Sequence, residues 1–112
     1  MGPSSADLGS VQIRHEVIGS IAVLAAQEVE GVMGVWLGTP VLRCFKKWSG
    51  VRVETGDLEV RLWLSIVVEY GMNLPQVAAF VQEKVRERVE QMTHLTASEV
   101  HVNVHQVKLK RS

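Results

Sequence analysis

Two histidines, His101 and His105, form the best candidate pair for a metal site or for acid–base chemistry. They lie four positions apart in a segment whose alternation of apolar and polar residues predicts a strand. Each residue of a strand advances the chain by about 3.3 Å, so the two side chains are expected roughly 13 Å apart. Zinc ligands lie at about 2 Å from the metal. The spacing therefore favours solvent-facing strand histidines over a metal site.

The only cysteine, Cys44, is the candidate nucleophile, but no recognisable motif ties a histidine or a carboxylate to it. Gly31 and Gly34 form a Gly-x-x-Gly pair that lacks the Lys-Ser/Thr ending of a phosphate-binding loop. Glu83 and Glu87 form a carboxylate pair on a charged helix face. We therefore expect no enzyme activity, cofactor, metal or small-molecule substrate. An enzyme that uses the cysteine or a strand histidine is the remaining alternative.

Basic and aromatic residues are mixed in one stretch without periodicity, residues 39–50, where we expect the longest loop. The candidates for partner binding in this loop are Arg43, Phe45, Lys46, Lys47 and Trp48. Such a mixture suits docking on acidic lipid, stacking on single-stranded nucleic acid, or binding to another protein. The alternative is that the two aromatic residues fold back to cap the core while the charges stay in water.

A second candidate surface lies on the long strand that is predicted for residues 59–70. One face of this strand is aliphatic and is expected to form the core, with Val60, Leu62, Leu64, Ile66, Val68 and Tyr70. Trp63 and Val67 lie on the opposite face. If helices cover only the first face, these two residues leave an apolar patch for self-association or partner binding. The alternative is that the sheet curls and covers them.

A basic edge with an aromatic residue would be typical of a nucleic-acid-binding module. The residues that would form it are Arg43, Lys46, Lys47, Arg52, Lys108, Lys110 and Arg111, with Trp48 stacking on a base. However, twelve Lys and Arg balance twelve Asp and Glu, so the formal net charge is zero. This balance counts against nucleic acid as a partner.

The elements that must position these residues follow from the hydrophobic periodicity. Strands are expected at 11–13, 31–37, 51–54, 59–70 and 99–109, and helices at 15–30 and 74–92. Asn73 precedes Gln76 by three residues, which is typical of a helix cap, and a phase shift in the last strand predicts a bulge near Gln106. His94 is expected in a left-handed turn. The order β-α-β-β-β-α-β predicts a two-layer α+β domain, with a mixed sheet of about five strands and both helices on one face.

The expected helices each carry one apolar stripe. The stripe of the first helix consists of Val17, Ile21, Leu24, Ala25 and Val29. The stripe of the second consists of Val77, Phe80, Val81, Val85, Val89 and Met92. We expect these stripes to pack on the aliphatic face of the sheet.

The length and composition are those of one globular domain, since 46% of the 112 residues are hydrophobic and 21% are charged. We expect a disordered N-terminus at residues 1–9 and a single domain at residues 10–110. A lone cysteine suits a reducing cytosol, and no stretch approaches the length of an apolar membrane span. We therefore expect a cytoplasmic protein.

Several segments carry a shared pattern, namely Val67–Gly71, Leu74–Val77, Val81–Val85, an opening pattern between Ile13 and Val32, and an ending between Met92 and Val107. Together they resemble the alkaline shock protein 23 family of bacteria. The resemblance covers about residues 11 to 109. This chain departs from the family in having Arg14-His15 where a small polar helix cap is usual, and His94 where glycine is usual.

The resemblance implies a non-enzymatic cytoplasmic protein of Gram-positive-type bacteria, linked to cell-envelope stress or homeostasis. Members of the family self-associate, and some are held at the inner face of the membrane by a separate anchor protein. Shorter members have also been connected with control of acetyl-CoA carboxylase, so a subunit of that enzyme is an alternative partner. Because the loop at 39–50 is variable in the family, the resemblance assigns no role to its residues.

Overall fold

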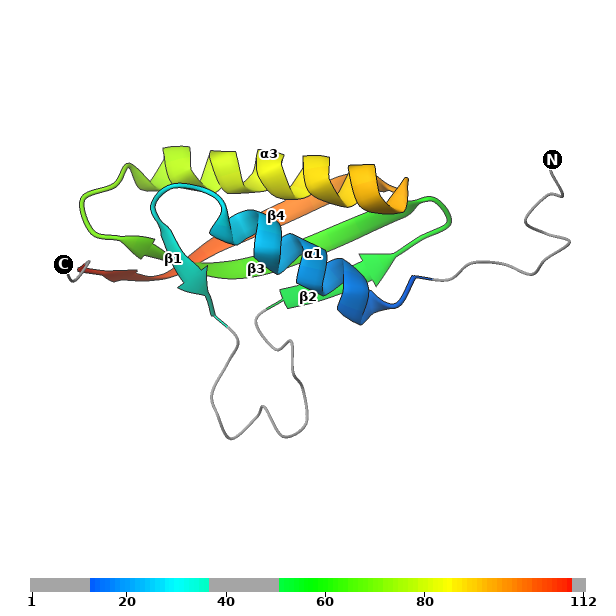
Figure 1. Cartoon of the computed structure of the whole chain (residues 1–112), viewed down its shortest axis with the longest axis horizontal. Coiled ribbons are helices and arrows are strands. Elements are labelled where there is room, and N and C mark those ends of the chain that lie inside the picture. Colours follow the sequence, from blue (N-terminus) through cyan, green and yellow to red (C-terminus); the bar gives the residue numbers. More distant parts are fainter. Residues whose placement is uncertain (1–12, 37–50, 110–112) are drawn as a thin grey trace, which may run out of the picture.

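The computed structural model of the chain describes residues 13–36 and 51–109, which form two helices and four strands (Figure 1). In chain order these are α1 (His15–Gln27), β1 (Val32–Val35), β2 (Val51–Thr55), β3 (Glu59–Glu69), α3 (Leu74–Thr93) and β4 (Thr96–Lys108). Ile13 is not part of a strand, and the rest of the strand expected at 11–13 lies outside the described residues. The loop expected at 39–50 also lies outside them.

The long strand β3 is the centre of a mixed sheet. β4 runs parallel to it along one edge, from the pair Glu59–Thr96 to the pair Glu69–Lys108. β1 and β2 share the other edge, and both are antiparallel to β3. The predicted α+β class and mixed sheet are confirmed, with four strands in the described part of the chain.

Both helices cover the same face of the sheet, with α1 packed over β1 and β2 and α3 packed over β4 (Figure 1). The predicted alternation of β3 is confirmed. Its core residues are Val60, Leu62, Leu64, Ile66 and Val68, each at most 2% exposed. Opposite them, α3 contributes valines at every fourth position, Val77, Val81, Val85 and Val89. Because residues four apart lie on one side of a helix, these valines form a narrow seam against the sheet.

Some residues of the predicted core are exposed. Tyr70 is 67% exposed because β3 ends at Glu69 and the chain turns at Gly71, where φ is 97°. Phe80 is 50% exposed, and Met92 is exposed as well, because the side of α3 that faces the sheet is the one that carries the valine seam.

The predicted stripe of α1 is confirmed for Ile21, Ala25 and Val29, each at most 8% exposed, and wrong for Val17 and Leu24. Its buried residues are Ile18, Gly19, Ile21, Ala22, Ala25 and Ala26. Val17 and Leu24, which were expected to be in the core, are 49% and 62% exposed. Small residues on the buried side allow the helix to lie close to β2: a Cβ added at Gly19 would lie 3.8 Å from Val51 Cγ1. The small side chains on one side of α1 therefore allow that side to pack closely on the sheet, and hydrophobicity alone does not determine which side is buried.

The predicted local signals around α3 and β4 are confirmed. The Asn73 side chain accepts a hydrogen bond from the Gln76 backbone N–H at 3.2 Å, and His94 caps the other end of α3 with φ at 62°. In β4, Val104 pairs with Ile66 and Gln106 pairs with Val67, so His105 is the extra residue of a β-bulge. Arg14 caps α1 without a side-chain hydrogen bond, as its departure from the family pattern predicts.

Candidate interaction face

The face of the sheet turned away from the helices carries a row of aromatic side chains. Trp63 on β3 pairs in register with Arg52 on β2 and with His101 on β4. Trp36, directly after β1, is held by a hydrogen bond of 2.8 Å from its backbone N–H to the carbonyl of Ser65. Both tryptophans are half-buried. Neither of the two helices in the described part of the chain covers this face.

The rings on this face are stacked. The ring centroids of Trp63 and His101 are 5.3 Å apart with an interplanar angle of 10°, and those of Trp36 and His105 are 4.1 Å apart with an angle of 20°. The Arg52 guanidinium carbon lies 5.4 Å from the Trp63 ring centroid. Because β2 and β4 flank β3, Arg52 and His101 approach Trp63 from opposite sides.

The bulge in β4 explains how the second stack forms. β1 and β4 lie on opposite edges of β3, so the Trp36 indole must reach across β3 to contact His105. A bulge re-aims the side chain of the extra residue, and His105 is that residue. We call Trp36, Trp63, Val67, His101 and His105 the aromatic face. Val67 belongs to it because the odd residues of β3 point away from the core.

Charged side chains on the aromatic face are paired with one another. Arg52 lies 2.9 Å from Glu54, and Arg61 lies 3.5 Å from the other oxygen of the same carboxylate. The His101 Nε2 atom lies 2.8 Å from Glu99 Oε1. These exposed pairs contribute at most about 1 kcal/mol each to stability. Their main consequence is that no excess of positive charge gathers beside the two tryptophans in the described part of the sheet.

A shallow hollow of about 290 Å³ lies beside Trp63. It is lined by Arg52, Trp63, Leu64, Ser65, His101, Val102 and Asn103. The Ser65 hydroxyl accepts a hydrogen bond from Asn103 Nδ2 at 3.5 Å. The hollow therefore combines an indole edge with hydroxyl, amide and imidazole groups, which suits contact with a polypeptide side chain.

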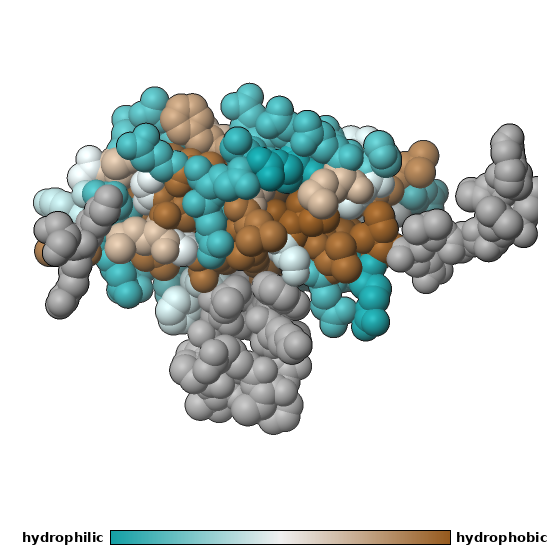
Figure 2. Space-filling model, viewed as in Figure 1, coloured by the Kyte–Doolittle hydropathy of each residue, from teal (hydrophilic) through white to brown (hydrophobic). Residues whose placement is uncertain are grey.

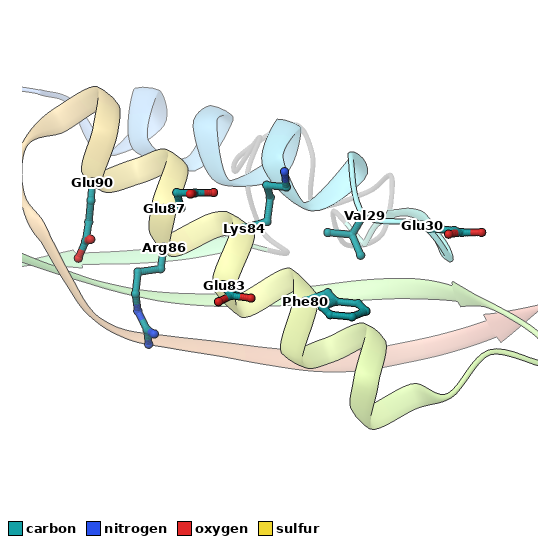
Figure 3. A pocket seen from close by; sticks show the side chains of 8 residues that line it. All are labelled: Val29, Glu30, Phe80, Glu83, Lys84, Arg86, Glu87 and Glu90. Atoms are coloured by element: carbon teal, nitrogen blue, oxygen red, sulfur yellow. The ribbon is translucent and has the colours of Figure 1, made fainter.

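A larger hollow of about 650 Å³ lies on the helical side of the molecule (Figure 3). It is lined by Val29, Glu30, Phe80, Glu83, Lys84, Arg86, Glu87 and Glu90. Glu28 ties the two helices together beside it, with 2.6 and 3.0 Å hydrogen bonds from Arg88 and a 3.9 Å contact to Lys84. The Glu90 carboxylate accepts a hydrogen bond from the Ala97 N–H at 2.9 Å. The charged groups in and beside this hollow thus connect α1, α3 and β4.

The described residues provide no metal centre. Across residues 13–36 and 51–109, no three His, Cys, Asp or Glu side chains are grouped so that they could hold a metal ion. The two candidate histidines of β4 contact different tryptophans. In the same part of the chain, no helix is both long and apolar enough to cross a membrane.

Comparison with known proteins identifies the family. The model of the alkaline shock protein 23 family, which is described as having a cell envelope-related function, matches residues 3–109. The chain belongs to the alkaline shock protein 23 family. The resemblance that the sequence showed is therefore confirmed.

Two relatives of this alkaline shock family member come from Gram-positive bacteria. YqhY, an uncharacterized protein of Bacillus subtilis, is 38% identical over 102 residues, which are 87% of this chain and 76% of YqhY. A stress response regulator gls24 homolog of Streptococcus pyogenes is 33% identical over 113 residues, 96% of this chain and 63% of the relative. The chain thus spans less than two thirds of the streptococcal protein. The family description and these relatives indicate an envelope-related or stress-related function.

Solved structures share the fold of this alkaline shock family member. A copper form of MamM CTD has a TM-score of 0.56 at 20% identity, covering 85% of this chain and all of that one. A nickel form of MamM CTD has a TM-score of 0.55 at 22% identity, covering 83% of this chain and 99% of that one. At this level of identity the likeness extends to the fold alone.

The predicted site residues of this alkaline shock family member fall into two groups. Trp63 and Val67 lie on the face away from the helices, where they are half-buried. The loop candidates, Arg43, Phe45, Lys46, Lys47 and Trp48, lie outside the described residues. Sequence reasoning missed Trp36 and the two stacking contacts. The outward alternation of His101 and His105 was visible, but their tryptophan partners depend on strand order and register.

Proposed function

We propose that the chain is a non-enzymatic, cytoplasmic interaction module that serves envelope or stress homeostasis by binding a protein partner through the aromatic face. The observation that carries this proposal is the row of stacked rings, with both tryptophans half-buried, on a sheet face that neither described helix covers. Through its partner the protein would act at the inner side of the cell membrane, although its own described helices do not cross it.

The chemistry of the aromatic face favours a protein as the ligand. Tryptophan and arginine are enriched at the centres of protein–protein interfaces, where they supply large contact areas. Here the Trp63 indole is already held between Arg52 and His101. A side chain that is ordered before binding loses less conformational entropy in the complex. The paired charges around it would form the polar rim of such an interface.

The same contacts disfavour single-stranded nucleic acid. Binding by base stacking needs an aromatic ring with a free face and a basic groove for the phosphates. His101 and Arg52 occupy the two sides of Trp63, and a carboxylate accompanies Arg52, Arg61 and His101. One face of the Trp36 ring is occupied by His105. An indole in these positions can still contact a protein through its edge.

The arrangement also supports a role without catalysis. His101 and Glu99 form an acid–base pair, but the imidazole is stacked on Trp63, and the Ser65 hydroxyl beside it is bonded to Asn103. General-base activation of a hydroxyl requires hydrogen-bonding reach between the two groups, directly or through one water. The contacts of Ser65 and His101 with other residues therefore favour a structural role for both.

The experiment that tests this function uses the purified chain as bait in lysate of its own bacterium. Trp63→Ala on a second column removes the centre of the aromatic face, and Phe80→Ala on a third is the matched control, because Phe80 is an exposed aromatic residue on α3. The proposal predicts that a membrane anchor protein or an acetyl-CoA carboxylase subunit is retained by the unaltered chain and by the Phe80 variant only. A further column with Lys46→Glu and Lys47→Glu tests the loop.

Two results would contradict the proposal. One is retention of the same protein by the folded Trp63→Ala variant. The other is retention of nucleic acid alone with loss at moderate salt, because phosphate contacts weaken steeply as salt rises. Circular dichroism and the melting temperature of each variant show that it is folded.

A further inference from the structure

The outer side of α1 is apolar although it faces water. Val17 and Leu24 are exposed there, Val23 is half-buried, and no charged residue occurs between Glu16 and Glu28. Figure 2 shows hydrophobic residues gathered over α1, whereas the neighbouring α3 presents a hydrophilic surface. A surface helix normally presents charged and polar residues on the side opposite the core, whereas here only Ser20 and Gln27 are polar between Glu16 and Glu28. One side of α1 packs on the sheet, so the other lacks a covering element within the described chain.

We propose that α1 forms an interface between two copies of this chain, in which the two α1 helices pack antiparallel across a two-fold axis. This surface lies on the helical side of the molecule. The proposal therefore goes beyond the partner site on the aromatic face, and each can fail without the other.

The positions of the outer residues fit a symmetric helix pair. Val17 and Leu24 are seven residues apart, which is about two turns or 10.5 Å along one side of the helix. With the two-fold axis between positions 20 and 21, Val17 of one copy lies against Leu24 of the other. The same contact then occurs twice, as symmetry requires.

Ser20 lies near the proposed axis and suits a close crossing. Its hydroxyl donates to the carbonyl oxygen of Glu16 at 2.9 Å. The donor of this small side chain is therefore satisfied within its own helix, and covering it leaves no unpaired group. A small residue at the crossing point also allows two helices to approach closely, within the usual interaxial distance of about 8–10 Å.

The charges at the helix ends favour the antiparallel orientation and a second copy as the occupant. The last turn of α1, residues 24–27, contains no basic side chain to offset the negative end of the helix dipole. In the antiparallel pair, the exposed Arg14 of one copy lies beside Gln27 of the other. Within its own chain, Arg14 forms an exposed ion pair with Glu16 at 3.1 Å. Exposed ion pairs are weak, so Arg14 can leave Glu16 for the end of the neighbouring helix. A parallel pair would bring Arg14 against Arg14.

The size of the interface predicts its strength. A helix of 13 residues is about 20 Å long, so one helix pair covers less than the roughly 800 Å² per partner of a standard stable interface. We therefore expect a dimer that dissociates on dilution. Crosslinking at a chosen position detects such a dimer together with its geometry.

The test uses cysteine variants in a Cys44→Ser background under mild oxidation. We expect Ser20→Cys to form a disulfide-linked dimer about tenfold faster than Glu87→Cys, an exposed control on α3, because association raises the effective concentration of the thiols. A mixture of Val17→Cys and Leu24→Cys is expected to crosslink, and Leu24→Cys alone is not. Equal rates for Ser20→Cys and Glu87→Cys would overturn the interface, and crosslinking of Leu24→Cys with itself would overturn the antiparallel geometry.

Sedimentation equilibrium of the unmodified chain provides an independent measurement. We expect a concentration-dependent dimer that Leu24→Glu abolishes, while Trp63→Ala retains it. A folded Leu24→Glu variant with the mass of the native protein at every concentration would overturn the proposal. Loss of the dimer in Trp63→Ala but not in Leu24→Glu would do the same, since it would assign self-association to the aromatic face.

Discussion

Trp63 and His101 lie directly opposite each other on the parallel strands β3 and β4, and their rings stack with centroids 5.3 Å apart. Since their strands are joined by the whole of α3, this contact depends on the complete β3–α3–β4 unit being folded. Arg52 completes the stack from β2. One aromatic residue therefore links three strands on the face that we assign to partner binding.

This stack predicts an energetic coupling between its two rings. Cross-strand side-chain pairs contribute roughly 0.2–1 kcal/mol relative to alanine pairs. We expect a double-mutant cycle of Trp63→Ala and His101→Ala, measured by urea unfolding, to give a coupling energy in this range. The pair Trp63→Ala and His105→Ala is the control, because His105 contacts Trp36 instead. Equal coupling energies in the two cycles would show that the Trp63–His101 stack does not contribute to the free energy of unfolding.

Gly31 is expected to tolerate no side chain. Its φ is 96°, and a Cβ there would lie 2.7 Å from Met72 Cε and 3.3 Å from Val77 Cγ2. We expect Gly31→Ala to lower the free energy of unfolding by about 1–3 kcal/mol. Gly34→Ala is the matched control, since no described residue other than its chain neighbours lies within 4 Å of a Cβ at that position and φ is not positive. A smaller loss at Gly31 than at Gly34 in thermal unfolding would contradict this.

His94 is expected to be replaceable by glycine with a gain in stability. It is the one non-glycine residue with positive φ among those described, at 62°. The left-handed conformation costs a non-glycine residue about 1–2 kcal/mol, whereas glycine adopts it freely but loses about 0.4–1 kcal/mol through the greater freedom of the unfolded chain. His94→Gly should therefore raise the free energy of unfolding by up to about 1.5 kcal/mol, and His94→Val should lower it. A higher free energy of unfolding for His94→Val than for the native chain would show that the backbone at this position is not strained.

The cap of α3 is expected to stabilise the domain. The Asn73 carboxamide oxygen accepts from the Gln76 N–H at 3.2 Å, with proline in the first turn of the helix. Replacing such a cap by alanine costs about 1 kcal/mol. We expect Asn73→Ala to lose this amount in urea unfolding, while Asn103→Ala, which removes an exposed hydrogen bond of 3.5 Å on β4, loses less. An Asn73→Ala variant as stable as the native chain would exclude this role.

Local signals in the sequence were sufficient for much of the fold. The alternation of Val60 to Val68 identified β3 and its core face, and Asn73, His94 and the phase shift near Gln106 marked a cap, a turn and a bulge that the structure confirms. Each of these features depends on residues close together in the chain.

The features that could not be predicted depend on residues far apart. Because α1 is apolar on nearly all sides, periodicity alone did not distinguish its buried side, with Ile18 and Ala22, from its exposed side, with Val17 and Leu24. Of the candidate site, Trp63 and Val67 could be assigned to the outer face by alternation. Their neighbours could not, since Trp36 reaches His105 only through the order of the strands and a bulge.

The most direct test of partner binding through the aromatic face is the dissociation constant of the captured partner with purified native chain and Trp63→Ala. A tryptophan at the centre of an interface contributes about 2 kcal/mol or more, which corresponds to weakening by about 30-fold. We expect that loss for Trp63→Ala and less than about a twofold change for Phe80→Ala. Equal affinities of the native chain and a folded Trp63→Ala variant would contradict binding through this face.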